Sequence, residues 1–161
     1  MNYIKEYSNS INKHFKYLVD DYNFIKKEDR FINESISCTV SYQNKYRYIN
    51  LTWGWHDVQF YFYVFKLDNN NIPLPYNDAG VGHFDIFELA CYHEPDKDWC
   101  KILDIGSVNP SIAVLNKKIK FNSEILYKYG KEILLGREWH DSKELRKINK
   151  KYVQQAGGAN S

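Results

Sequence analysis

The stretch 35–67 contains three runs of alternating apolar and polar residues, and this pattern constrains the fold more than any other part of the chain. Such alternation is typical of a β-strand with one buried face. The two breaks between the runs, Asn44-Lys45 and Gly54-Trp55, suit two-residue hairpin turns, because asparagine and glycine tolerate the backbone angles that these turns require. The stretch therefore predicts a three-stranded antiparallel meander.

The two turns also predict a register for the strands. The first turn pairs Val40 with Ile49, and the second pairs Leu51 with Val58. A slip of one residue would exchange the two faces of a strand, so the apolar pattern favours this register over an odd shift. The face that we expect to be buried under the N-terminal helix and a C-terminal helix contains Ile36, Cys38, Val40, Ile49, Leu51, Trp53, Val58, Phe60, Phe62 and Val64.

The opposite face of the predicted sheet, which we call the tyrosine face, is unusually aromatic. It is expected to contain Tyr46, Tyr48, Asn50, Gln59, Tyr61, Tyr63 and Phe65, with Tyr48 opposite Tyr61 and Tyr46 opposite Tyr63. These rings would form a large apolar patch if water covered them all. Three arrangements are open: cover by other parts of the chain, binding of a protein partner, or stacking of single-stranded RNA with help from Lys45 and Arg47.

Helical periodicity flanks this sheet on both sides. Apolar residues recur every three or four positions over 3–22, and Asn23 is the expected end of this helix, with Phe24 turning back onto the core. A shorter helix is predicted over 84–92, ended by Pro95, with a strand or an irregular return over 99–105.

The C-terminal part is predicted to be helical. Asn109 as N-cap and Pro110 at the first helical position predict a helix that runs to Leu135, either unbroken or interrupted at 121–123, with a stop at Gly136. Asp141 and Glu144 resemble a capping box that opens a last helix. The prediction is a single α+β domain over 1–155 with a flexible tail over 156–161 and an architecture of N-terminal helix, three-stranded antiparallel meander and C-terminal helices.

The composition predicts a cytoplasmic protein. No run approaches the ~20 apolar residues that span a bilayer, so no membrane partner is expected. The N-terminus is interrupted by charged residues and does not resemble a secretory signal. Three cysteines, Cys38, Cys91 and Cys100, are too few for a disulfide framework.

No motif identifies a reaction, and we expect no catalytic residue, metal or cofactor. His83, Cys91, His93 and Cys100 have zinc-ligand chemistry, but their spacing lacks the two close pairs of a structural zinc site. Cys91 beside His83 or His93 would be the only candidate for a cysteine nucleophile. A small enzyme or ligand-binding protein with a pocket near residues 68–93 therefore stays an alternative.

Charge is distributed unevenly along the chain. Residues 68–104 carry eight acidic and two basic side chains, a formal charge of −6, whereas the chain as a whole is at +2. The acidic groups Asp85/Glu88 and Glu94/Asp96/Asp98 could perform acid–base chemistry or bind a cation, and solvated surface residues explain them equally well.

Three segments resemble the small bacterial immunity proteins of contact-dependent and polymorphic toxin systems. They are LVDDYNF (18–24), VSYQNKYRYINLTW (40–53) and KEILLG (131–136). The resemblance implies a non-catalytic domain that binds and neutralises a cognate protein toxin. It transfers no binding residue, because such surfaces differ from pair to pair.

An acidic segment could complement a basic toxin and accelerate the encounter. Nucleic acid is not expected as a partner, because the strand order of common RNA-binding sheets is absent and the segment after the meander is acidic. The partner-binding surface that we expect comprises Asp78, Asp85, Glu88, Glu94, Asp96 and Asp98 together with Tyr46, Tyr48, Tyr61 and Tyr63.

Overall fold

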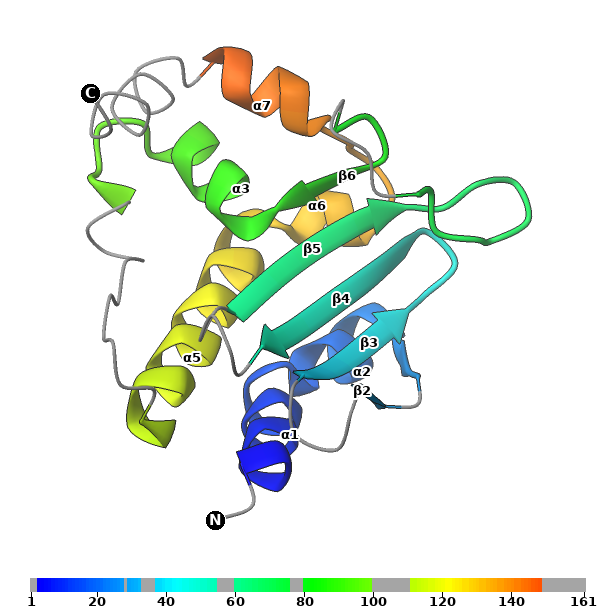
Figure 1. The fold of residues 1–161 in the computed structure, drawn as a ribbon. Coiled ribbons are helices and arrows are strands. Elements are labelled where there is room, and N and C mark those ends of the chain that lie inside the picture. Colours follow the sequence, from blue (N-terminus) through cyan, green and yellow to red (C-terminus); the bar gives the residue numbers. More distant parts are fainter. Residues whose placement is uncertain are drawn as a thin grey trace.

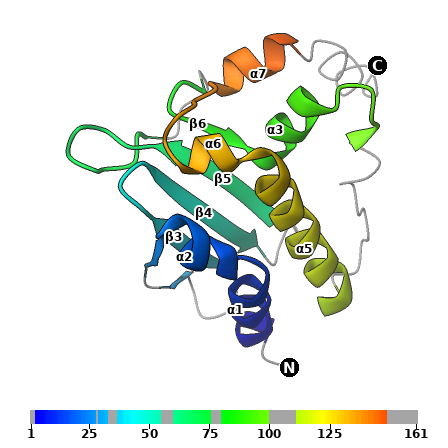
Figure 2. The ribbon, with the colours of Figure 1, turned by 180° about the vertical axis from the view of Figure 1, so that it is seen from behind.

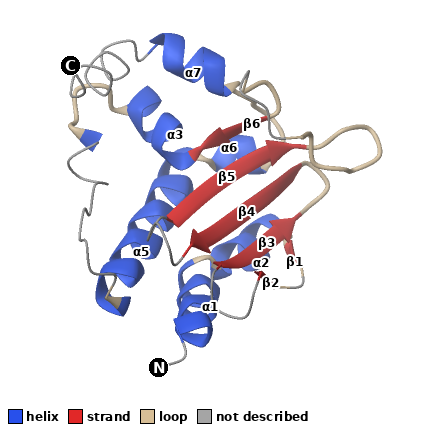
Figure 3. Ribbon diagram, viewed as in Figure 1, coloured by secondary structure: helices blue, strands red, loops and turns tan. Residues whose placement is uncertain are grey.

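The protein has an α+β fold in which helices pack against an antiparallel sheet (Figure 1, Figure 3). The computed structural model describes residues 3–27, 29–32, 37–54, 60–75, 80–99 and 111–148. The predicted N-terminal helix, meander and C-terminal helices are all present. The tail over 156–161 lies outside the described residues.

The predicted meander is the centre of a six-stranded sheet with the order β1-β3-β4-β5-β6, in which β2 also pairs with β3. The strands are β1 (Ile25–Lys26), β2 (Arg30–Ile32), β3 (Ser37–Gln43), β4 (Arg47–Gly54), β5 (Phe60–Lys66) and β6 (His83–Asp85). Every pairing is antiparallel. The long central strands are thus flanked by strands of only two or three residues, which leaves little open edge for pairing with another chain.

The predicted register is wrong by an even number of residues in both hairpins. Val40 pairs with Leu51 instead of Ile49. Leu51 pairs with Phe62 instead of Val58. Gly54 lies inside β4 opposite Ser37, so the predicted Gly54-Trp55 turn is wrong, and the connection falls within 55–59, outside the described residues.

The first turn is Lys45-Tyr46, one residue later than predicted. The side-chain oxygen of Asn44 accepts the backbone N–H groups of Tyr46 at 2.8 Å and Arg47 at 2.9 Å. Its amide nitrogen donates to the carbonyl oxygens of Tyr22 and Leu134, at 3.2 and 3.1 Å. Asn44 therefore precedes the turn and fastens it to the ends of two helices.

An even shift keeps every side chain on its face, and the predicted core face is confirmed where the structure describes it. Ile36 and Val58 lie outside the described residues. Tyr42 is also buried on this face. The predicted residues that are buried are Cys38, Val40, Ile49, Leu51, Trp53, Phe62 and Val64, and Phe60 is partly buried against them.

The predicted N-terminal helix is divided in two at Phe15. The two parts are α1 (Tyr3–His14) and α2 (Lys16–Tyr22), and Asn23 ends the second with a φ of 56°. Phe24 is buried at 2% exposure, as predicted. Phe84 belongs to β6 and not to a helix, so the predicted helix over 84–92 is wrong at its start; α3 spans Ile86–His93 and ends before Pro95.

The helix predicted from Asn109 to Leu135 begins and is divided at other residues than predicted, whereas the stop at Gly136 and the last helix after Asp141 agree with the prediction. Ser111, and not Asn109, is the N-cap of α5 (Ile112–Tyr129), because its hydroxyl accepts the N–H of Val114. This helix is continuous through 121–123 and ends at Gly130. It is followed by α6 (Lys131–Leu134), by Gly136 with a φ of 77° at the predicted stop, and by α7 (Ser142–Ile148) directly after Asp141.

The helices α1, α2, α5 and α6 lie on one face of the sheet (Figure 2). Tyr7 of α1 donates a hydrogen bond of 2.8 Å to the carbonyl oxygen of Leu51. Phe15 meets Phe62 edge-on, with ring centroids 5.3 Å apart. The core therefore fills the space between these helices and the predicted apolar face of the meander.

Candidate functional site

The tyrosine face carries a continuous row of aromatic rings. Tyr48 lies opposite Phe65 across β4 and β5, with ring centroids 5.8 Å apart. Along β5, Tyr61 and Tyr63 stack in nearly parallel planes at 6.4 Å, and Tyr63 lies 6.2 Å from Phe65. His83 of β6 extends the row, 5.6 Å from Phe65. Alternation along the strands thus brings three of the four predicted tyrosines together.

Tyr46 is not part of this row, contrary to the prediction. It lies in the first turn at 36% exposure, and its ring contacts Gly136, beyond α6. Arg47 is also absent from the face: it is 6% exposed, donates to the carbonyl oxygen of Glu138 at 2.6 Å and lies over the ring of Trp139. Tyr46 faces the helices because the true turn is one residue later than expected. Arg47 does so because it alternates in step with the buried residues Ile49 and Leu51 of β4.

Within the described residues, no helix covers the tyrosine face (Figure 1, Figure 2). The rings of Tyr48, Tyr61 and Tyr63 are nevertheless only half-exposed, and Phe65 is 8% exposed. Each of the three tyrosines therefore keeps part of its surface open to solvent.

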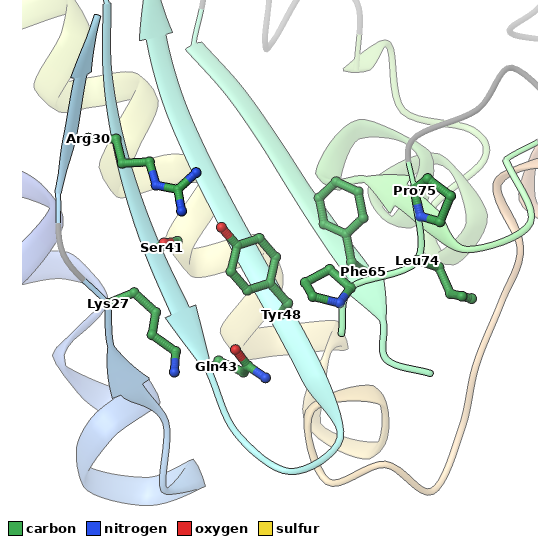
Figure 4. Close-up of a pocket in the computed structure, with 9 residues that line it drawn as sticks. Lys27, Arg30, Ser41, Gln43, Tyr48, Phe65, Leu74 and Pro75 are labelled. Atoms are coloured by element: carbon green, nitrogen blue, oxygen red, sulfur yellow. The ribbon is translucent and has the colours of Figure 1, made fainter. Parts of the chain in front are cut away.

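A groove of about 680 Å³ lies at one end of the tyrosine face (Figure 4). We call it the basic groove. It is lined by Lys27, Arg30, Ser41, Gln43, Tyr48, Phe65, Pro73, Leu74 and Pro75. One wall comes from Lys27, which follows β1, and from Arg30 of β2; the floor comes from β3, β4 and β5, and the other wall from the loop after β5.

The loop wall is fastened to the sheet by backbone and side-chain hydrogen bonds. Leu67 and Pro73 form a β-bridge, and the N–H of Leu74 donates to the carbonyl oxygen of Lys66 at 3.0 Å. The Gln43 side chain donates to the carbonyl oxygen of Asn71 at 2.8 Å. The groove is therefore a built feature of the fold with two fixed walls.

The charge of the basic groove comes from Lys27 and Arg30. Both are exposed, and neither has an ion-pair partner among the residues that the structure describes. The neighbouring Asp29 pairs instead with Lys26 at 3.1 Å and accepts the Ser8 hydroxyl at 3.0 Å. No carboxylate belongs to the described lining, so the groove presents two cations beside aromatic and proline rings.

A smaller pocket of about 160 Å³ lies where β5 meets α3 and α5. Tyr61 and Tyr63 line it together with Lys118 and Asn122 of α5. Asp85, opposite Tyr63 in the sheet, also lines it. The far end of the tyrosine face therefore has an acidic neighbour, in contrast to the groove.

The predicted acidic residues do not gather into one patch. Asp85 and Glu88 form a capping box at the start of α3: the Asp85 carboxylate accepts the N–H of Glu88 at 2.8 Å, and the Glu88 carboxylate accepts that of Asp85 at 3.1 Å. Glu88 also accepts the Ser142 hydroxyl of α7. These two carboxylates thus position α3 relative to the sheet and to α7.

The remaining described acidic residues lie at the other end of α3. Glu94 is the C-cap residue and accepts from Lys128, Lys97 and the Tyr129 hydroxyl, and these bonds lower its pKa to about 2. Asp96 and Asp98 are exposed in the following turn. Asp78 lies outside the described residues. α3 has eight residues, so the two acidic groups are separated by about 12 Å of helix.

The histidines and cysteines considered for metal or thiol chemistry have different surroundings. His83 is buried beside Tyr63 and Phe65, whereas the exposed His93 stacks on Tyr129 at 4.5 Å. Cys91 is buried at 2% exposure, and Cys100 lies outside the described residues. Within the described part of the chain, no group of three or more potential ligands could hold a metal ion.

Cys38 is buried on the core face, and burial raises the pKa of its thiol to about 12. A thiol with such a pKa is not a nucleophile at neutral pH. Among the described helices, none combines the length and the apolar character that crossing a lipid bilayer requires.

The sequence analysis missed the groove-lining residues Lys27, Arg30, Ser41 and Gln43. Ser41 and Gln43 carried a usable signal, because they alternate with Val40 and Tyr42 on a predicted strand. Lys27 and Arg30 carried none, because β1 and β2 are too short for a periodic pattern.

Comparison with models of protein families, with curated proteins and with solved structures finds no match to this chain. These comparisons assign neither a family nor an activity. The geometry of the tyrosine face and of the basic groove is therefore the evidence on which a functional proposal rests.

Proposed function

We propose that this chain is a non-catalytic interaction domain that binds a partner protein through its tyrosine face. The observation that carries the proposal is the row of Tyr48, Phe65, Tyr63 and Tyr61 on a sheet face that no described helix covers. Tyrosine combines a large apolar ring with a polar tip, which suits a surface that is wet when free and dry when bound.

The rings are also pre-organised for binding. Each lies on a central strand and contacts its neighbour at 5.8 to 6.4 Å, so little side-chain freedom remains to be lost on association. Rigid aromatic anchors at the centre of an interface contribute most of the binding energy in typical complexes.

The partner that we propose is a protein toxin, which the domain neutralises in the cytoplasm. This part rests on the resemblance of 18–24, 40–53 and 131–136 to immunity proteins. Asp96 and Asp98 are exposed and could meet a basic partner. The hydrogen bonds of Glu94, Asp85 and Glu88 position α3 against its neighbours, so we propose that these three carboxylates have a structural role.

Co-expression with the toxin domain encoded by a neighbouring gene tests this proposal. We expect the wild-type chain to protect cells and to form a complex with that domain, and the variant Tyr61→Ala/Tyr63→Ala to lose both properties. Tyr127→Ala is the matched control, because Tyr127 is 58% exposed on α5, on the helical side of the molecule.

Three results decide the proposal. Thermal unfolding shows whether each variant is folded. If folded Tyr61→Ala/Tyr63→Ala protects as well as the wild type, the tyrosine face is not the binding surface. If no neighbouring gene encodes a toxic domain, or if the wild type gives no protection, the toxin part of the proposal fails.

A further inference from the structure

The two cations of the basic groove are held by the same strand. The backbone N–H of Lys27 donates to the carbonyl oxygen of Ser41 at 2.8 Å, and Arg30 pairs with Thr39. Thr39 and Ser41 are two residues apart on β3, a spacing of about 7 Å along a strand. The backbone of both cationic residues is therefore fixed at one side of the groove, across from Pro75 of the loop wall (Figure 4).

An apolar rim lies at the Gln43 end of this groove. Ile25 is 69% exposed and is the direct cross-strand partner of Gln43, so both side chains lie on the tyrosine face. Ile72 is 58% exposed and follows Asn71, which accepts the hydrogen bond of the Gln43 side chain. These two isoleucines add exposed apolar surface at the Gln43 end of the groove.

We infer that the basic groove binds an acidic segment of the partner protein, with a carboxylate beside Lys27 and Arg30 and an apolar side chain against Tyr48. This inference rests on the proposed function, because it specifies which part of the partner contacts one end of the tyrosine face. Lys27 and Arg30 disfavour a basic segment at this position, whatever the charge of the rest of the partner.

The same surface is poorly suited to a single-stranded nucleic acid. Sequence-independent binding of a strand needs a run of cations along its phosphates. Among the described residues that line the groove only two are cations, and the row of rings continues toward Asp85, which lies opposite Tyr63. A phosphate backbone along the rings would meet this carboxylate, whereas a short peptide segment ends before it.

Selection from a phage library of random dodecapeptides tests the inference without knowledge of the partner. We expect the wild-type chain to enrich peptides in which Asp or Glu accompanies an aromatic or aliphatic residue. The variant Lys27→Glu/Arg30→Glu should lose these peptides, with an affinity at least about tenfold weaker for each, and should enrich basic peptides instead. Both side chains are exposed, so the substitutions should leave the melting temperature nearly unchanged.

Lys143→Glu/Lys147→Glu is the matched control. These exposed lysines lie on α7, and their reversal changes the net charge by the same amount as the groove variant. We expect this control to select the same acidic peptides as the wild type. The inference is wrong if the groove variant and the wild type select the same peptides, or if neither selects acidic ones.

Binding of a fluorescein-labelled dodecamer of uridine provides the second readout. If it binds the wild type and loses affinity in Lys27→Glu/Arg30→Glu, the groove is a nucleic-acid site and the inference is overturned. Failure of the inference is distinguishable from failure of the proposed function. If the toxin complex depends on Tyr61 and Tyr63 but is unaffected by Lys27→Glu/Arg30→Glu, the proposed function stands. Only the binding of an acidic segment in the groove is then wrong.

Discussion

The two faces of the meander are built from the same strands and are both aromatic, but the described helices cover only one of them. On β5, Phe62 and Val64 point into the core, whereas Tyr61 and Tyr63 point to the face that no described helix covers. The core side chains Phe62 and Val64 have no polar atom, whereas Tyr61 and Tyr63 carry a hydroxyl. Phe65 shares the tyrosine face without a hydroxyl and is 8% exposed beside Tyr48 and Tyr63. The half-exposed positions of this strand thus carry a polar tip, because a buried hydroxyl without a partner costs free energy.

Two tyrosines on the core side donate their hydroxyl groups to backbone carbonyl oxygens. Tyr7 is completely buried, and its hydroxyl is hydrogen-bonded to the carbonyl oxygen of Leu51. Burial raises the pKa of this phenol well above its usual range. Tyr17 is likewise bonded to the carbonyl oxygen of Ser123, at 3.1 Å. A tyrosine is therefore tolerated beneath the helices where the backbone supplies an acceptor.

The largest difference between the faces should appear when adjacent residues of β5 are truncated. We expect Phe62→Ala to lower the free energy of unfolding by about 3–5 kcal/mol, because it leaves a cavity in the core beside Phe15. Tyr63→Ala should cost about 1 kcal/mol, because its ring is only half-buried. Urea denaturation measures both, and equal losses would show that the tyrosine face is covered as fully as the core.

The division into two faces could be predicted from the sequence, and the register could not. Side chains alternate with a period of two, so errors of two and four residues in the pairing left every described residue of β3, β4 and β5 on its predicted face. The turn positions depend on contacts between distant parts of the chain. Asn44 takes its place before the turn because its side chain also bonds Tyr22 and Leu134, which no local pattern reveals.

The candidate site was predictable to the same degree. Tyr48, Tyr61 and Tyr63 follow from alternation alone, whereas Tyr46 was misplaced through the error in the turn. The spacing of Asp85 and Glu88 is that of a capping box, so their structural role had a local signal. No local signal marked Lys27 and Arg30 as residues of the groove, because the pairing of this segment with β3 brings them there.

The position of Tyr46 on the helical side can be tested through Gly136. A methyl group at this glycine would lie 2.5 Å from the Tyr46 ring, and the φ of 77° is strained for any L-residue with a side chain. We expect Gly136→Ala to lower the free energy of unfolding by about 1–3 kcal/mol.

The double variant Tyr46→Ala/Gly136→Ala separates the two causes. Removal of the ring relieves the clash but leaves the backbone strain, so the double variant should lose less than the sum of the two single variants. If the changes in the free energy of unfolding measured by urea denaturation are strictly additive, the ring does not lie against Gly136. Tyr46 would then lie on the open side of the turn, as predicted from the sequence.

Removal of single hydroxyls sharpens the comparison without creating cavities. Tyr7→Phe should lower the free energy of unfolding by about 1–2 kcal/mol, because it deletes a buried hydrogen bond. Tyr48→Phe, on the half-exposed tyrosine face, should change it by less than about 0.5 kcal/mol. Thermal unfolding of the two variants measures the difference, and a loss for Tyr48→Phe as large as that for Tyr7→Phe would contradict it.

The smallest expected effect concerns Glu94, an acidic residue engaged on the helical side of the molecule. Hydrogen bonds from Lys128, Lys97 and Tyr129 lower the pKa of its carboxyl from 4.5 to about 2. Because the pKa is lower in the folded state, the interaction stabilises the fold above pH 4.5, and this contribution is lost as the pH falls from 4.5 toward 2. The side chain is accessible to solvent, so screening keeps the effect modest.

Melting temperatures of the wild type and of Glu94→Gln between pH 7 and pH 2 test this engagement. We expect the wild type to melt at a higher temperature at pH 7 and the two curves to converge toward pH 2, since the variant has no carboxylate to protonate. The neighbouring His93 contributes to the difference between the two proteins, because burial lowers its pKa and the charge on Glu94 raises it. Glu124→Gln, which breaks only an exposed pair with Lys120 at 3.8 Å, should show a smaller difference at every pH. If Glu94→Gln melts like the wild type at pH 7, Glu94 is not held by α5, and its carboxylate is as accessible to a basic partner as Asp96 and Asp98.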